Sequence, residues 1–77
     1  MALVLENCLT NIDIARRNAR EAIDNKDKED ADRKIKIYRD KLDTAECLFD
    51  DLKVKQARID YGVILAIYEG AFGRKFT

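Results

Sequence analysis

The chain has no histidine, no serine and no tryptophan, and only two cysteines among its 77 residues. Without histidine it lacks the side chain whose charge changes near neutral pH, and without serine it lacks a common nucleophile. Neither Cys8 nor Cys47 has an obvious activating neighbour, and two cysteines are too few to hold zinc. We therefore predict that the protein is not an enzyme and holds no metal or cofactor. Its thiols are expected to stay free in a reducing compartment.

Proline is absent too, and glycine occurs only at positions 62, 70 and 73. Because glycine and proline are the strongest markers of turns, and serine is absent as well, few positions in the chain mark a turn. The fold class is therefore expected to be all-α, with one helical domain over residues 1–77. A domain this small buries a modest share of its surface, so a small helical bundle completed by oligomerisation is expected.

Neither sign of charge is in excess, since 15 Lys and Arg balance 15 Asp and Glu. Proteins that bind phosphate backbones usually carry a basic surplus, so nucleic acid is not expected as a partner. The apolar run at 61–68 is far shorter than the roughly 20 residues that span a bilayer. The first six residues lack the basic start and long apolar run of a secretory signal. We expect a soluble, cytoplasmic protein without a membrane span.

Apolar and small residues at the start of the chain recur in alternating four- and three-residue steps, the a/d pattern of a coiled coil. The positions of this first stripe are Met1, Leu5, Cys8, Ile12, Ala15, Ala19 and Ala22. They predict a helix over about residues 2–24, whose alanines allow a partner helix to approach closely. The alternative is a capped start at Thr10–Asp13, which would leave the first nine residues as an arm.

The first stripe stops at residues 24–30, the one convincing turn in the sequence. Asn25 tolerates the left-handed conformation that ends helices, and Asp27 can cap the helix that follows. Two acidic residues, Glu29 and Asp30, then fall in the first turn of that helix, where the helix dipole favours them. This segment predicts an antiparallel helical hairpin.

A second stripe begins after the turn and keeps the same alternation over residues 31–70. Its positions are Ala31, Ile35, Tyr38, Leu42, Ala45, Phe49, Leu52, Gln56, Ile59, Val63, Ala66 and Gly70. The unbroken phase favours one long second helix over residues 28–72, about 65 Å in length. The alternative is a bend near residues 50–55, which would give a compact three-helix bundle. Gln56, the one polar occupant, fits either a register-setting position or a solvated bend.

The stretch over residues 61–72 carries a single charge, in a chain that is 39% charged. If the second helix is continuous, the first is too short to cover this stretch, and a second copy is expected to do so. The predicted oligomer interface consists of Val54, Tyr61, Ile64, Leu65, Tyr68 and Phe72. The competing interpretation is the third helix of a bundle, wrapped by its own chain. A membrane-surface helix and a groove for a foreign partner are further alternatives.

Basic side chains gather at one level of the predicted hairpin. They are Arg16, Arg17, Arg20, Lys36 and Arg39. The planar guanidinium of arginine suits carboxylates and phosphates, so this cluster is a candidate contact for an anion or an acidic partner. The other interpretation is an ordinary solvated helix surface.

These patterns predict a small, non-catalytic helical interaction protein that acts as a regulator, an inhibitor or an assembly adaptor. It is expected to bind another macromolecule, an unidentified protein, and to form a homo-oligomer, most simply a dimer, through its C-terminal helix. The alternative function is a helical binding module for a small anionic ligand such as a nucleotide or phosphate. That ligand would be held by the basic cluster or at a subunit junction.

Overall fold

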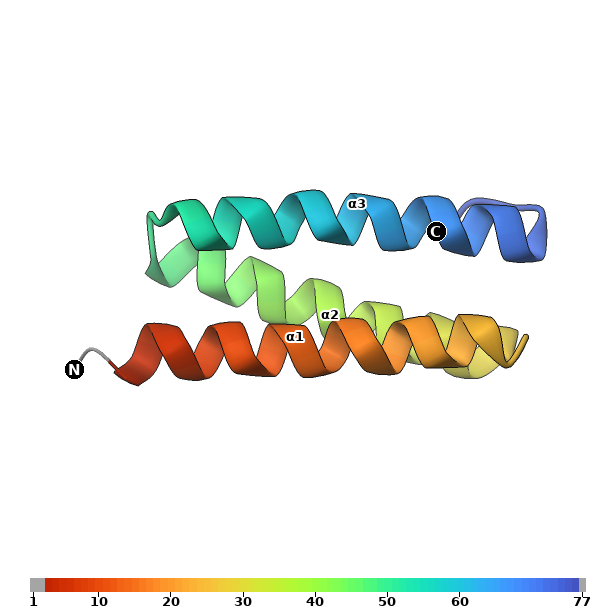
Figure 1. The fold of residues 1–77 in the computed structure, drawn as a ribbon, viewed down its shortest axis with the longest axis horizontal. Helices are drawn as coiled ribbons and strands as arrows, with labels where there is room; N and C mark the ends of the chain where they lie inside the picture. Colours follow the sequence, from red (N-terminus) through yellow and green to blue (C-terminus); the bar gives the residue numbers. More distant parts are fainter. Residues whose placement is uncertain (1–2, 77) are drawn as a thin grey trace.

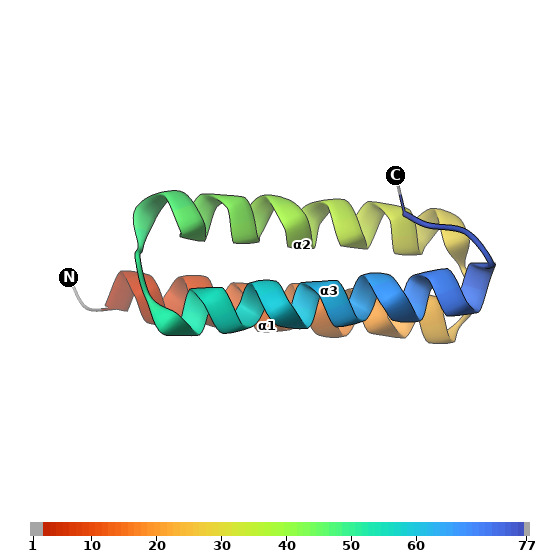
Figure 2. The ribbon, with the colours of Figure 1, turned by 90° about the horizontal axis from the view of Figure 1, so that it is seen from above.

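The computed structural model describes residues 3–76, which form three α-helices and no strand (Figure 1). The helices are α1 (Leu3–Asp24), α2 (Lys28–Leu48) and α3 (Leu52–Phe72). Each helix runs antiparallel to the one before it, so α1 and α3 run in the same direction and both lie beside α2 (Figure 2). The bundle is a rod of 41 × 16 × 15 Å. This arrangement confirms the predicted all-α class. Met1, the first position of the predicted stripe, and Ala2, the predicted start of the first helix, lie outside the described residues.

Most of the core between α1 and α2 is the one that the two stripes predict, although Ile23, which lies outside the first stripe, is buried and Leu5 and Cys8 are only partly buried. Its α1 members Ile12, Ala15, Ala19 and Ala22 are all buried. The core members from α2 have no exposed surface; they are Ala31, Ile35, Tyr38, Leu42 and Ala45. The capped start at Thr10–Asp13 is wrong, because α1 is already helical at Leu3.

The first connection, residues 25–27, lies where the sequence places it. Asp27 caps α2, since its carboxylate accepts a hydrogen bond from the backbone N–H of Asp30 at 3.1 Å. The left-handed residue is Lys26, with φ of 58°, and not Asn25 as predicted. The N–H of Lys26 returns to the carbonyl of Ile23 at 3.0 Å, which satisfies one of the last carbonyl groups of α1.

The long second helix is wrong, because the chain turns at residues 49–51. Phe49 and Asp51 both have extended backbones, with φ of −134° and −135°. Any L-residue can adopt this conformation, so the turn needs neither glycine nor proline. Asp51 then caps α3 by accepting a hydrogen bond from the N–H of Lys53 at 2.8 Å. The alternative with a bend is therefore the correct one.

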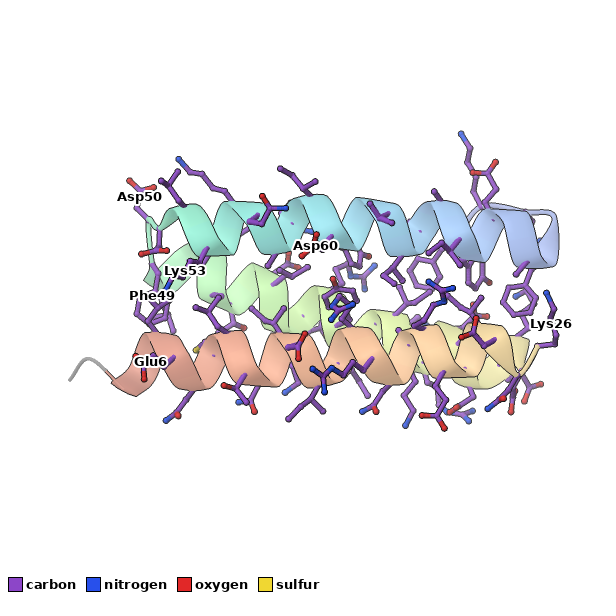
Figure 3. All side chains as sticks on the ribbon, in the orientation of Figure 1. Glu6, Lys26, Phe49, Asp50, Lys53 and Asp60 are labelled. Carbon is purple, nitrogen blue, oxygen red and sulfur yellow. The ribbon has the colours of Figure 1, made fainter. Side chains whose placement is uncertain are left out.

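The second connection also changes which face of α3 meets the core. Three non-helical residues break the helical phase, so the heptad count cannot be carried across them. The buried members of α3 are Val54, Tyr61, Ile64 and Tyr68. The predicted continuation of the second stripe is instead exposed, at Leu52, Gln56, Ile59, Val63, Ala66 and Gly70. In Figure 3, Lys53 and Asp60 lie between α3 and α1, which marks the edge of the buried face.

Replacing Asp51 with alanine is expected to lower the free energy of unfolding by about 1 kcal/mol, because α3 loses its cap. Urea unfolding followed by circular dichroism would measure the change. The matched control is Asp50→Ala, since the Asp50 side chain is 95% exposed and is not the cap. The control should change stability by less than about 0.5 kcal/mol. Equal effects of the two substitutions would contradict the assignment of the cap.

Candidate functional site

Helix α3 uses the predicted interface residues inside its own bundle. Four of them are buried, with no more than 7% of their surface exposed; they are Val54, Tyr61, Ile64 and Tyr68. The other two, Leu65 and Phe72, are partly buried against the same core. In the bundle these six side chains therefore pack in or against the core of their own chain, although Leu65 and Phe72 keep part of their surface exposed.

Aromatic rings hold the inner face of α3 against α2 and the C-terminal tail. The rings of Tyr38 and Tyr61 meet edge to face, with 5.0 Å between their centroids. Tyr68 contacts Phe72 and Phe76 at 4.9 and 5.7 Å. Phe76 reaches Tyr68 because the chain doubles back after α3, toward the start of α2 (Figure 2). Such ring pairs contribute about 0.5–1.5 kcal/mol each beyond burial, and here they help to fix the rotation of α3.

An arginine on α3 binds two carboxylates on α2. The guanidinium of Arg58 donates to Asp43 at 2.7 Å and, through Nε, to Glu46 at 3.0 Å. The hydrogen bond from Arg58 lowers the pKa of Glu46 below its usual range. The same guanidinium lies 5.3 Å from the ring centroid of Tyr61, close enough for a cation–π contact. This group of contacts ties the first half of α3 to the last turns of α2.

A second polar contact ties the other end of α3 to the start of α2. The hydroxyl of Tyr68 donates a hydrogen bond to the Asp32 carboxylate, and Lys28 donates to the same carboxylate at 3.0 Å. Burial alone would raise the pKa of Asp32, but the hydrogen bonds from Tyr68 and Lys28 outweigh it and lower that pKa. With both ends tied, α3 has one rotation in the bundle.

Tyr38 lies at the centre of the core with no exposed surface. Its hydroxyl has no hydrogen-bond partner among the residues that the structure describes. Burial raises the pKa of Tyr38 to about 12. Because this exceeds the unfolded value of about 10, neutral Tyr38 makes its full contribution to the stability of the fold below pH 10. That contribution is lost as the pH rises toward 12.

The substitution Tyr38→Phe tests both the missing hydrogen bond of the Tyr38 hydroxyl and the raised pKa of Tyr38. At pH 7 it should either raise the free energy of unfolding or lower it by less than about 1 kcal/mol, because no hydrogen bond is lost. At pH 12 it should make the protein more stable than the wild type by about 2 kcal/mol, because no phenol remains to ionise. Urea unfolding at several pH values between 9 and 12 would measure the difference. Parallel pH profiles for the two proteins would contradict the raised pKa.

The side of α3 that faces away from the core is apolar as well. Ile59 and Val63 keep 62% and 54% of their surface exposed. A Cβ atom added to Gly62 or Gly70 would meet nothing within 4 Å, so no contact inside the chain requires either glycine. Glycine inside a helix costs about 1 kcal/mol relative to alanine. We call this surface the outer stripe, and it consists of Leu52, Gln56, Ile59, Gly62, Val63, Ala66 and Gly70.

Carboxylates accompany most of the predicted basic cluster. The pairs are Arg16–Asp13 at 2.7 Å, Arg17–Asp13 at 3.0 Å, Arg20–Asp24 at 3.0 Å and Arg39–Asp40 at 4.0 Å. Lys36 is exposed on α2. The structure does bring Arg16 and Arg20 together, in a hollow between α1 and α3 that also contains Asp60. These carboxylates offset much of the positive charge that an anion would need.

The remaining chemistry of the described residues is sparse. Within residues 3–76, no three His, Cys, Asp or Glu side chains gather closely enough to hold a metal ion. Both thiols are free, with Cys8 half-buried and Cys47 exposed. No helix in the described range has the length and apolarity needed to cross a membrane. The outer stripe holds Leu52, Ile59 and Val63, three of the seven large apolar side chains that are exposed among the described residues.

Sequence reasoning identified most of the outer stripe as apolar but placed it in the core. The signal that corrects this is the pair Asp50 and Asp51 ahead of Leu52, since aspartate is among the best residues for capping a helix. A new helix starting at Leu52 requires its buried face to be assigned afresh. Gly62 was not assigned to any surface by the heptad pattern.

Comparison with protein-family models, with curated proteins and with solved structures found no match to this chain.

Proposed function

We propose that this chain is a small, non-catalytic interaction protein, acting as a regulator, an inhibitor or an assembly adaptor. It binds another macromolecule and self-associates through α3. The observation that carries this proposal is the outer stripe, with Ile59 and Val63 more than half exposed beside the exposed Ala66. Single exposed apolar side chains are ordinary on protein surfaces. A row of them along one helix is typical of a contact surface.

The chemistry of the stripe favours a protein helix as the partner. Its exposed positions recur in four- and three-residue steps, the spacing that a helix of another chain can match. Lys55 flanks the stripe near its start and Glu69 near its end, so the charges at its edges are mixed. A nucleic acid would require a basic surplus, and a membrane surface would disfavour the acidic side chains.

A capture experiment tests the proposal. The immobilised full chain would be exposed to an extract of the source cells, with Val63→Glu as the test variant. The matched control is Ile14→Glu, because Ile14 is 50% exposed on α1 and Val63 is 54% exposed on α3. Wild type and control should retain the same protein, while Val63→Glu should lose at least about tenfold in affinity for it. Equal retention by all three chains, or no retained protein in repeated trials, would contradict the proposal.

The anion-binding alternative has less support, because carboxylates accompany Arg16 and Arg20. We expect phosphate and nucleotides to leave the melting temperature unchanged. A stabilisation that disappears in the double variant Arg16→Gln and Arg20→Gln would favour the alternative instead.

A further inference from the structure

The outer stripe is bulky at its start and small at its end. Leu52, Gln56 and Ile59 occupy its first half, and Val63, Ala66 and Gly70 occupy its second half. Two such stripes pack evenly when they run in opposite directions, because each larger side chain then meets a smaller or similar one. Leu52 would face Gly70 of the second copy, and Ile59 would face Val63. A parallel pair would instead set Leu52 against Leu52 and Gly70 against Gly70, which spreads one end and leaves a gap at the other.

The heptad spacing gives one antiparallel register in which every a/d position of the outer stripe is paired. The a/d positions of the outer stripe are 52, 56, 59, 63, 66 and 70. In antiparallel coiled helices each a position meets a d position of the partner. The three pairs 52 with 70, 56 with 66, and 59 with 63 all share a midpoint at residue 61. One two-fold axis at this level therefore satisfies every pair.

The charges on one flank of the stripe agree with that register. Lys55 and Glu69 lie at equal distances in sequence from Gly62 and are both exposed. An antiparallel pair sets Lys55 of each copy beside Glu69 of the other, which gives two attractive contacts about the axis. Inside its own chain, Lys55 lies 3.6 Å from Asp50, whose side chain is 95% exposed. At the axis Gly62 meets Gly62, so the two backbones can approach closely.

The other flank carries Asp60, and near the two-fold axis Asp60 of one copy lies close to Asp60 of the other copy. Arg16 lines the same hollow as Asp60, on the α1 side of α3. Arg16 is already paired with Asp13 at 2.7 Å, so it offsets the two aspartates of a dimer only in part. The attraction between Lys55 and Glu69 on the first flank has to exceed the repulsion that remains between the two Asp60 side chains.

We infer that α3 of one copy pairs antiparallel with α3 of a second copy through the outer stripe, with the two-fold axis level with Tyr61 and Gly62. This inference rests on the proposed function, whose self-association it specifies. Interfaces that bury less than about 1,200 Å² in total are generally weak. A contact made by one helix from each copy belongs to this class, so the dimer is expected to form at high protein concentration and to exchange.

Sedimentation equilibrium of the full chain tests the pairing, at concentrations from about 10 µM to about 1 mM. The wild type and Ile14→Glu should both approach twice the monomer mass as the concentration rises. Val63→Glu should remain folded by circular dichroism and raise the dissociation constant at least about tenfold. A wild type that stays monomeric throughout, or a Val63→Glu variant that associates as the wild type does, overturns the inference.

A charge exchange tests the orientation. Lys55→Glu and Glu69→Lys should each weaken the dimer, because each places like charges side by side across the axis. The double variant should associate about as strongly as the wild type, since the opposite charges then meet again. A parallel dimer cannot give this rescue, because it never sets residue 55 beside residue 69. Failure of the double variant to recover overturns the antiparallel register.

The two proposals fail in different ways. A monomeric wild type that still captures a protein, and loses it in Val63→Glu, removes the dimer and keeps the interaction function. A dimer that captures nothing in repeated trials keeps this inference and removes the binding of another macromolecule.

Discussion

Replacing Tyr68 with alanine is expected to lower the free energy of unfolding by about 3–5 kcal/mol. The side chain is 1% exposed, and its ring packs against Phe72 and Phe76. Its hydroxyl donates to Asp32, so the carboxylate loses a partner as well. Small domains are stable by about 5–15 kcal/mol, so the loss is a large fraction of the total.

The companion variant Tyr68→Phe keeps the ring and removes the hydrogen bond alone. It should lower the free energy of unfolding by about 1–3 kcal/mol, as expected for a hydrogen bond to a charged group. Urea unfolding at neutral pH would measure both variants. A Tyr68→Ala variant that remains as stable as the wild type would contradict the placement of Tyr68 in the core. Tyr68 would then be a candidate interface residue, as the sequence predicts.

Replacing Ala19 with leucine is expected to lower the free energy of unfolding by about 1–3 kcal/mol. Ala19 has no exposed surface and lies on the alanine-rich part of the first stripe. Three extra carbon atoms there must displace a helix or take up a strained rotamer.

The matched control for this prediction is Asn18→Leu, on the exposed side of the same turn. The control adds leucine to the same helix and should change stability by less than about 0.5 kcal/mol. Thermal unfolding at one fixed protein concentration compares the two. Similar melting temperatures for both variants would show that the alanines are not needed for close packing.

The parts of the fold that follow from local pattern are predictable from the sequence. Ile12 and Ala19 on α1, and Ile35 and Leu42 on α2, are buried because the a/d positions of two neighbouring helices must face each other. Asp27 caps α2 because aspartate accepts hydrogen bonds from free N–H groups at a helix start. These features need no information from distant residues.

The rotation of α3 is not predictable in this way. Val63 and Ile64 are adjacent and both apolar, so periodicity alone cannot say which one faces the core. The choice is made by contacts across the bundle, such as Arg58 with Glu46 and the edge-to-face rings of Tyr38 and Tyr61. These partners lie on another helix, and one sequence does not reveal the pairing. The same contacts expose the outer stripe, so the candidate site was missed for the same reason.

The connection at residues 49–51 offers a route by which two copies of the chain can exchange α3. The heptad spacing of the second stripe runs through this connection without a break, although the folded chain turns there. If these three residues became helical, α2 and α3 would join into one helix of about 65 Å. The inner face of α3 would then leave its own bundle and could be covered by α1 and α2 of another copy, which is a domain-swapped dimer.

Asp51 opposes this exchange by capping a separate α3. The double variant Asp51→Ala and Val63→Glu, which removes both the cap and the outer stripe, would reveal it as a dimer that persists on dilution. A double variant that is monomeric at every concentration would exclude domain swapping.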